Sequence, residues 1–259
     1  MSEQILFVGG LIKSGTTLLQ RILDHHPEVC CLIEQDLSHL LALFKSENDA
    51  IGSLVNKNFK LTQYFPLIVK NLLKHNCNKK IIGVNDNKFL LDNIDEILEI
   101  FENVKMIFII RNPIDSILSG WDHRRRLSKL NVVSKKQKRQ KRNDFLLERA
   151  YTWNAVTSKI LNSVNNCPEN IFTIKYEELV ANKANTIQKV FNFLGIDHKP
   201  SIVAEIIKET TFEKMKKDAN DPSFYKEART GGDTSKIDHN LLKQIYSLTI
   251  DNRKKLNYN

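Results

Sequence analysis

An anion-binding pattern lies near the start of the chain, at residues 9–17, which read GGLIKSGTT. The apolar run Ile5–Val8 precedes it and a helical pattern begins at Thr16, so a strand, a glycine turn and a helix start follow one another. Backbone N–H groups in such a turn converge on one anion, and the helix dipole adds favourable partial charge. We therefore predict a phosphate site. Its ligands are the residues that bring a positive charge, a hydroxyl or a glycine amide: Lys13, Ser14, Gly15, Thr16 and Thr17.

A second anion-binding pattern follows the clearest buried strand of the sequence, KMIFII at residues 105–110. Arg111 comes directly after this strand, and open α/β sheets bind ligands at the carboxyl ends of their strands. Ser119 follows, about two helical turns further on. A guanidinium can bind a phosphate through two parallel hydrogen bonds, and the serine hydroxyl adds a donor. The competing interpretation is an ordinary ion pair between Arg111 and Asp115.

The first pattern differs from the phosphate loop of NTPases, which reads G-x-x-x-x-G-K-[ST]. Gly10 and Gly15 have the required spacing, but Thr16 stands where the lysine belongs and the lysine has moved upstream to Lys13. A lysine at this place cannot follow the β- and γ-phosphates in the usual way. This weakens the alternative of a small-molecule kinase.

The run KSGTT at residues 13–17 resembles the 5′-phosphosulfate loop of the sulfotransferase superfamily, and the run from Arg111 to Ser119 resembles its 3′-phosphate motif. The resemblance implies a P-loop NTPase-like sulfotransferase fold. It also implies 3′-phosphoadenosine 5′-phosphosulfate (PAPS) as the donor, adenosine 3′,5′-bisphosphate (PAP) as the product, and no metal ion. Lys13 would contact the phosphosulfate and neutralise charge on the bridging oxygen. The implied reaction moves a sulfuryl group in line to a hydroxyl acceptor.

Two further stretches are similar to sulfotransferase sequences. Residues 174–179 (IKYEEL) resemble the family's strand–Tyr–Glu–x–Leu stretch, which implies that Tyr176 packs near the adenine; a tyrosine with core contacts is the alternative. Residues 229–233 (RTGGD) resemble a shortened Arg-Lys-Gly…Gly-Asp loop of cytosolic sulfotransferases. The resemblance implies that this loop closes over the 3′-phosphate, and a purely structural loop is the alternative. The residues that would make the contact are Arg229, Thr230 and Gly231.

Several residues are candidates for the general base. Residues 21–34 resemble tyrosylprotein sulfotransferases, whose catalytic glutamate follows the basic residue of the phosphate loop at the distance that separates Glu34 from Lys13. The same carboxylate could instead cap the following helix. The rival bases are three histidines: His25, His26 and His123. The first two fit a helix end, where a protonated imidazole suits the dipole.

One lysine that the resemblance implies is missing. Relatives carry it at the end of the second strand, where it stabilises the transferring sulfuryl group, and Asn85 stands at that place. Lys88 follows three residues later. Either a shifted loop brings Lys88 to the sulfuryl group, which we favour, or Asn85 acts as a neutral donor.

The formal net charge of +9 is concentrated in residues 124–142, which contain ten Lys or Arg and no acidic residue; subtracting ten from +9 leaves −1 for the rest. A run of this kind favours anionic partners. These include an acidic acceptor such as a glycan or lipid head group, a membrane contacted peripherally, and nucleic acid. Because two nucleotide motifs stand in their expected places, nucleic-acid binding is the least favoured. A solvated loop is the plain alternative.

A parallel sheet is needed to bring these side chains together. Apolar runs at residues 5–8, 80–84, 105–110 and 171–175 alternate with helical patterns. This predicts a three-layer α/β/α domain with a central parallel sheet over residues 1–259, with a basic insertion at about 124–142. Helices are predicted at residues 16–25, 36–44, 61–75, 90–101, from 113 onwards, 145–161, 178–194, 202–209 and 240–248.

Composition and cysteine spacing suggest a cellular location. No apolar run approaches the roughly 18–20 residues of a membrane span, and the N-terminus lacks the features of a signal peptide. The cysteines have no metal-ligand spacing and are expected as reduced thiols. They are Cys30, Cys31, Cys77 and Cys167. We therefore predict a cytoplasmic enzyme without a transmembrane segment.

Overall fold

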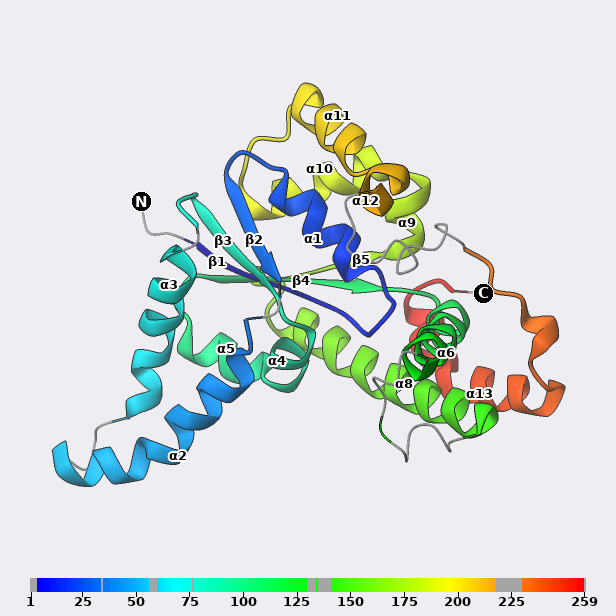
Figure 1. Cartoon of the computed structure of the whole chain (residues 1–259), viewed down its shortest axis with the longest axis horizontal. Helices are drawn as coiled ribbons and strands as arrows, with labels where there is room; N and C mark the ends of the chain where they lie inside the picture. The colour runs from blue at the N-terminus through cyan, green and yellow to red at the C-terminus, as the bar shows by residue number, and fades with distance from the viewer. Residues whose placement is uncertain are drawn as a thin grey trace.

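The structure is a computed structural model that describes residues 4–33, 35–55, 60–75, 77–129, 134, 141–217 and 230–258, the side chains of residues 48–55 and 236 excepted. Five parallel strands form one sheet in the order β2-β3-β1-β4-β5 (Figure 1). They are β1 (Gln4–Gly9), β2 (Val29–Ile33), β3 (Ile81–Asn85), β4 (Val104–Ile110) and β5 (Ile171–Lys175). Because β1 and β4 are adjacent, the two predicted phosphate sites that follow them lie at the same edge of the sheet.

Helices cover both faces of the sheet, which confirms the predicted α/β/α fold (Figure 1). The first half of the chain contributes α1 (Thr16–Asp24), α2 (Leu37–Val55), η1 (Leu61–Tyr64), α3 (Phe65–His75), α4 (Asn87–Asp92), α5 (Ile94–Ile100) and α6 (Pro113–Lys129). The second half contributes α8 (Arg142–Asn166), α9 (Tyr176–Ala181), α10 (Lys183–Leu194), α11 (Pro200–Glu209), α12 (Phe212–Lys217), η3 (Thr234–Lys236) and α13 (His239–Lys255). None of the helices within the described ranges combines the length and apolar character needed to cross a membrane.

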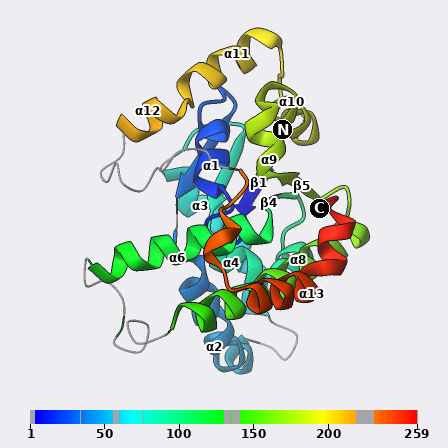
Figure 2. The same ribbon diagram turned by 90° about the vertical axis from the view of Figure 1, so that its right-hand side faces the viewer.

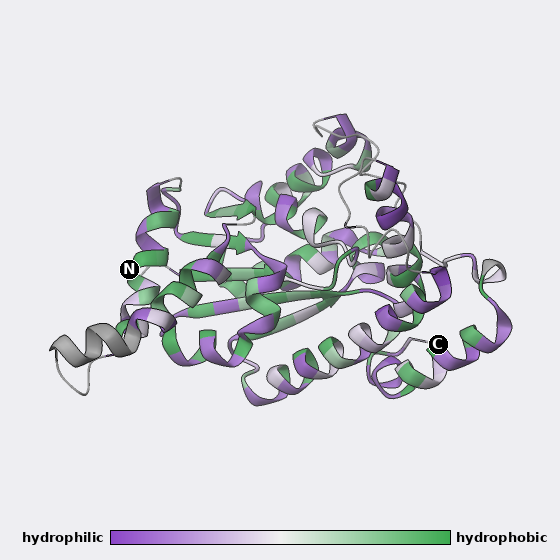
Figure 3. Ribbon diagram, turned by 60° about the horizontal axis from the view of Figure 1, so that its bottom comes forward, coloured by the Kyte–Doolittle hydropathy of each residue, from purple (hydrophilic) through white to green (hydrophobic). Residues whose placement is uncertain are grey.

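The central strands are apolar on both faces because each face is covered by helices. On one face, the ring of Phe7 lies 5.4 Å from the rings of Phe89 and Phe101, centre to centre. On the other face, Leu6 and Val8 pack with α1, α9, α10 and α11. Figure 3 shows the strands as predominantly hydrophobic between helices of mixed character. Burial of one such side chain is worth about 1.5–3 kcal/mol, so β1 is a firm support for the turn that follows it.

Some elements differ from the sequence-based expectation. The strand β2 (VCCLI) is not predicted, because it is short, lies at an edge of the sheet and is fully buried only at alternate residues. Two predicted helices are each divided at an asparagine. Asn93 separates α4 from α5 and donates from its side chain to the carbonyl oxygen of Phe89 at 2.8 Å, and Asn182 separates α9 from α10. Such side chains compete with the helix for backbone hydrogen bonds.

The prediction of four reduced thiols is wrong for two of them. Cys30 in β2 and Cys77 before β3 form a disulfide, with their Cα atoms 6.1 Å apart. The two residues are 47 positions apart in sequence, so their spacing gave no sign of the pairing, which depends on β2 lying beside β3. Cys31 and Cys167 are free thiols.

Candidate active site

The turn between β1 and α1 is tightly packed and requires its glycines. Lys13 and Gly15 both have left-handed backbone conformations, with φ of 73° and 105°. A Cβ atom on Gly10 would lie 2.4 Å from the carbonyl oxygen of Ile109, and one on Gly15 would lie 2.5 Å from a ring carbon of Tyr176. Larger side chains are therefore excluded at both glycines, and the loop is pressed against β4 and α9.

The donors of this loop fit an anionic ligand. Helix α1 begins at Thr16 with no side-chain cap and no acidic residue in its first turn, so none of its own side chains competes for the positive end of the helix. The hydroxyl of Ser14 is buried and has no hydrogen-bond partner among the described residues. Thr17 and the positively charged Lys13 are half-buried beside them. A phosphate or phosphosulfate group would supply the acceptors that these donors require.

Arg111 reaches from the end of β4 to the phosphate loop. Its Nη1 donates to the carbonyl oxygen of Lys13 at 3.1 Å, although the two residues are 98 positions apart in sequence. The backbone of Arg111 is held in turn by Trp153, whose Nε1 donates to the Arg111 carbonyl oxygen at 2.9 Å. The two predicted phosphate sites are therefore in direct contact at the carboxyl edge of the sheet.

Tyr176 packs between the two sites. Its ring contacts Gly15 on one side, and the guanidinium of Arg111 lies 4.4 Å from the ring centre. Burial raises the pKa of the Tyr176 phenol, with the positive charge of Arg111 acting in the opposite direction. The ring of Tyr176 therefore orients the guanidinium of Arg111 and packs closely against the phosphate loop at Gly15. The contact of Tyr176 with adenine stays a prediction.

Helix α6 brings the predicted Ser119 to the site and also Ser116, which was not among the predicted residues. Ser119 is half-buried two turns into the helix. Ser116 is buried one turn earlier, and its hydroxyl donates to the carbonyl oxygen of Ile12 in the phosphate loop at 3.5 Å. A small pocket between the loop and α8 is lined by Ser116 together with Ser14 and Arg111. A second hydroxyl in the first turn of the Arg111 helix was the available signal, but its partner could not be read from the sequence.

The loop before α13 is fastened to the start of α6. Asp115 accepts hydrogen bonds from the amides of Gly231 and Gly232, at 3.0 Å and 2.5 Å. Figure 2, which looks onto the carboxyl edge of the sheet, shows this segment passing beside α6. Thr230 is exposed, and Arg229 lies outside the described residues. In this structure the Gly231 amide therefore binds a carboxylate, and its contact with a 3′-phosphate stays a prediction.

Positive charges surround His123 on α6. Partial burial, and then the charges of Lys13, Arg126 and Arg149, lower the pKa of His123 to about 4. Arg126 Nη2 donates to His123 Nδ1 at 3.0 Å. The imidazole is therefore neutral near pH 7 and carries its proton on Nε2. The structure thus brings His123 into the electrostatic field of the phosphate-loop lysine.

The ends of β2 and β3 form the other side of the site. Asn85 is buried at the end of β3, and its Oδ1 has no hydrogen-bond partner among the described residues. Asn87 accepts from the amide of Gly10 at 3.0 Å and so ties α4 to the phosphate loop. Lys88 is exposed in the first turn of α4. Glu34 follows β2 in the sequence and lies outside the described residues.

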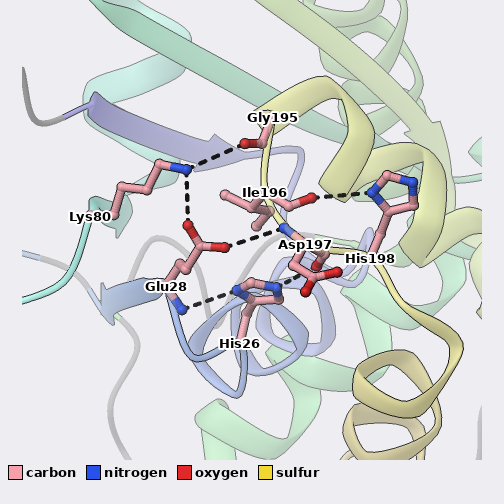
Figure 4. A network of polar contacts seen from close by, with 7 residues as sticks. All are labelled: His26, Glu28, Lys80, Gly195, Ile196, Asp197 and His198. Atoms are coloured by element: carbon pink, nitrogen blue, oxygen red, sulfur yellow. Dashed lines mark hydrogen bonds and ion pairs between the residues drawn. The ribbon is translucent and has the colours of Figure 1, made fainter. Parts of the chain in front are cut away.

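His25 and His26 lie at the opposite, amino edge of the sheet and take no part in this site. The ring of His26 is fully buried: Nε2 donates to the carbonyl oxygen of Asp197 at 2.7 Å, and Nδ1 accepts from the amide of Glu28 at 3.1 Å (Figure 4). The Glu28 carboxylate binds Lys80 at 2.9 Å. The predicted place of both histidines at a helix end is confirmed, since His25 caps the C-terminus of α1.

Comparison with known proteins gives a family. A profile of the sulfotransferase family matches residues 5–200. A Caenorhabditis briggsae protein assigned as a protein-tyrosine sulfotransferase is 26% identical over 213 residues, which cover 78% of this chain and 69% of that protein. The protein-tyrosine sulfotransferase of Drosophila melanogaster is 22% identical over 217 residues, or 77% of this chain and 39% of that protein. A 3-alpha-hydroxysteroid sulfotransferase of Cavia porcellus is 29% identical over 113 residues. The chain spans about two fifths of the latter two proteins, 39% and 38%.

Solved structures share the fold. Mouse sulfotransferase SULT7A1, complexed with PAP, superposes with a TM-score of 0.65 at 17% identity, covering 98% of this chain and 85% of that one. A sulfotransferase domain from the curacin biosynthetic pathway superposes with a TM-score of 0.61 at 19% identity, covering 100% and 99%. The family profile spans both anion-binding motifs and favours the sulfotransferase interpretation over the kinase alternative. The chain therefore belongs to the sulfotransferase family.

Proposed function

We propose that the protein is an enzyme that transfers the sulfuryl group of PAPS to a hydroxyl group by in-line displacement. The observation that carries this proposal is the direct contact between the two anion-binding motifs, from Arg111 Nη1 to the Lys13 carbonyl oxygen, at the carboxyl edge of β1 and β4. Two cationic sites this close together suit one nucleotide that carries phosphates on both sides of its ribose. The presence of PAP in the mouse relative supports the same donor.

The residues divide between the two ends of the donor. Those that would hold the 5′-phosphosulfate are Lys13, Ser14, Gly15, Thr16 and Thr17; those for the 3′-phosphate are Arg111, Ser119, Arg229, Thr230 and Gly231. When bound, the donor supplies an activated sulfuryl group. Lys13 places a positive charge where negative charge develops on the bridging oxygen, an effect that is strong in a site shielded from water. Lys88 is the first candidate to neutralise the sulfuryl oxygens and Asn85 the second.

Glu34 is the proposed general base. Its neighbour Ile33 ends β2 and pairs with Asn85 in β3, at the edge of the sheet where the phosphate loop also lies. His123 is a poor base in this arrangement, because Nδ1 accepts from Arg126, Nε2 carries the proton, and a pKa of about 4 makes the ring weakly basic. Its Nε2–H is suited to donating to an anionic oxygen instead.

A test of the base compares Glu34→Gln with the wild-type enzyme. The variant should bind PAP with unchanged affinity and lose about 10²–10⁴-fold in kcat, the range for a general base. Titration calorimetry measures the affinity and single-turnover transfer of labelled sulfate measures the rate. A wild-type rate in this variant would return the role to His123.

The acceptor that fits this site carries negative charge near its hydroxyl. Arg124 and Arg149 lie 5.0 Å and 5.2 Å from the centre of the Phe145 ring, so α6 and α8 present their guanidiniums together near His123. Residues 124–142 extend this charge in the sequence, although 130–133 and 135–140 lie outside the described residues. An acidic glycan, a lipid head group or an anionic small molecule would be drawn to such a surface.

Two measurements test the function. Titration calorimetry should give a much lower Kd for PAP than for ATP with Mg²⁺; the reverse order would support a kinase. Transfer of labelled sulfate from PAPS should then be compared between hydroxyl acceptors with and without an adjacent anionic group. The double variant Arg124→Ala/Arg149→Ala should lower kcat/KM for the anionic acceptor alone. An equal loss for both acceptors would mean that the two arginines do not select for charge.

The cytoplasmic location stays a prediction. It rested in part on reduced thiols, whereas disulfides such as Cys30–Cys77 persist mainly in oxidising compartments. Alkylation of intact cells followed by mass spectrometry tests it, because modified Cys30 and Cys77 would support the cytoplasm and an intact disulfide would support an oxidising compartment.

We also propose a peripheral contact with membranes, through a surface away from the donor site.

A further inference from the structure

The segment formed by η1 and α3 is apolar on its exposed side as well as on its buried side. Phe65, Val69 and Leu73 are at most 1% exposed and pack into the core beside β3. The exposed side also carries large apolar side chains, each 39% to 56% exposed: Tyr64, Leu67, Ile68 and Leu72. Leu67 and Ile68 follow Tyr64 by three and four residues, and Leu72 follows Ile68 by four, so the four side chains form one stripe along successive turns. A stripe of apolar side chains on the solvent-exposed surface of a protein marks a contact site.

The charged residues that this segment itself contributes all have one sign. Residues 56–85 contain six lysines and no Asp, Glu or Arg. Two of the lysines serve the amino edge of the sheet, where Lys79 donates to the carbonyl oxygen of Val29 at 2.9 Å and Lys80 binds Glu28. Lys70 and Lys74 follow Leu67 by three and seven residues, so they border the stripe. Lys74, and Lys60 just before η1, are exposed.

We propose that this α3 face, formed by Tyr64, Leu67, Ile68 and Leu72 with Lys60, Lys70 and Lys74, docks on the surface of an anionic lipid bilayer. Apolar side chains of such a face enter the boundary between head groups and acyl chains, while lysines at its border reach the anionic head groups. A tyrosine at the end of the stripe suits the same boundary.

The positive charge of the α3 face favours an anionic bilayer over a second copy of the chain as its partner. Two α3 faces brought together would oppose lysines to lysines with no acidic residue of residues 56–85 between them, whereas anionic lipid complements them. In Figure 1, α3 lies at the opposite end of the molecule from α6, so docking by α3 leaves the donor site open to solution. The proposal does not depend on the proposed function.

Sedimentation with lipid vesicles tests the proposal on the full chain. Binding is compared between phosphatidylcholine vesicles and vesicles that also contain about 30 mol% phosphatidylserine. We expect binding to the anionic vesicles only, and loss of that binding in about 0.5 M salt. The variants Leu67→Ser/Leu72→Ser and Lys60→Glu/Lys74→Glu should each bind at least about ten-fold more weakly, which is about 1.4 kcal/mol. A matched control is Tyr151→Ser/Ile250→Ser, because these two side chains are also exposed, at 57% and 40%, but lie on α8 and α13.

Three outcomes would overturn the proposal. The wild-type chain could fail to bind anionic vesicles. Both α3 variants could bind as strongly as the wild type, which would assign the contact to residues 124–142 instead. Lastly, sedimentation velocity could show a wild-type dimer that Leu67→Ser/Leu72→Ser converts to a monomer, which would assign the face to a second copy. Unchanged circular dichroism and PAP affinity in each variant ensure that a loss of vesicle binding is not a loss of fold.

Discussion

The two edges of the sheet use the same kinds of side chain in different ways. At the amino edge, His26, Glu28 and Lys80 bind one another or the backbone, and Lys79 donates to three carbonyl oxygens, those of Asp24, His26 and Val29. At the carboxyl edge, Lys13, Arg126 and Arg149 converge on His123 closely enough to depress its pKa. The side chains at the first edge bind one another and the backbone, whereas at the second edge burial and nearby positive charges lower the pKa of a histidine.

This difference shows why residue type alone does not locate a site. One histidine follows a helix and another lies within one, each near a basic residue, and both were candidates for a catalytic base. One of them, His26, uses both ring nitrogens to close the fold beside Phe191, with ring centres 4.6 Å apart. The other, His123, lies among cations that a bound anion would neutralise. A histidine whose ring nitrogens both bind the backbone serves the fold, whereas a histidine with a strongly shifted pKa in a cleft is a candidate for a functional site.

The sharpest test of the comparison replaces one lysine at each edge. Lys13→Ala should lower kcat by at least about 10²–10³-fold, because it removes a charge aimed at the developing negative charge. Lys80→Ala should leave kcat within about two-fold and cost at most about 1 kcal/mol of stability, since its ion pair with Glu28 is largely solvated. Steady-state transfer of labelled sulfate and urea denaturation measure the two quantities. Comparable rate losses in both variants would break the distinction between the edges.

The next largest effect concerns stability. His26→Ala should lower the free energy of unfolding by about 2–4 kcal/mol, because it removes two hydrogen bonds and a fully buried ring that packs on Phe191. The kcat of the folded variant should equal that of the wild type. His123→Asn, the matched change at the other edge, should alter the rate more than the stability. A catalytic loss in folded His26→Ala would contradict the assignment of this residue to the fold.

Local patterns were sufficient to predict that the two anion-binding motifs follow strands of a parallel sheet, because KSGTT comes shortly after an apolar strand and Arg111 comes directly after one. The same holds for the parallel α/β class. The remaining contacts join residues far apart in sequence. The bond from Gly231 to Asp115 spans 116 positions and that from His26 to Asp197 spans 171, so both depend on the strand order. The short edge strand β2, with Cys30 in it, gave no periodicity to read, and the disulfide was missed for that reason.

A smaller effect on PAP affinity is expected from Asp115, and Asp238 is its comparison because both carboxylates accept hydrogen bonds from two backbone amides. Asp115→Ala should weaken PAP binding by about ten-fold, near 1.4 kcal/mol, because the amides of Gly231 and Gly232 lose the group that holds their loop at the site. Asp115→Asn should have an intermediate effect. Asp238 also accepts from two amides but caps α13, so Asp238→Ala should reduce stability and leave PAP affinity unchanged. Titration calorimetry checks all three, and an unchanged affinity in Asp115→Ala would detach the loop from the nucleotide site.

The smallest expected effect is the dependence of stability on pH. The pKa of His123 is about 4 in the folded protein, below the ordinary histidine value of 6.5, so between these values the unfolded chain binds a proton that the folded chain does not. Stability should therefore fall as the pH decreases through this window and be unaffected by His123 above it. Because the ring is partly exposed, solvent screening keeps the effect modest. His123→Asn should remove this component of the Tm–pH curve, and saturating PAP should reduce it in the wild type because added negative charge offsets the surrounding cations. Identical curves for variant and wild type would show that neither burial nor those cations lower the pKa of the ring, and the electrostatic difference between the two edges would then be lost.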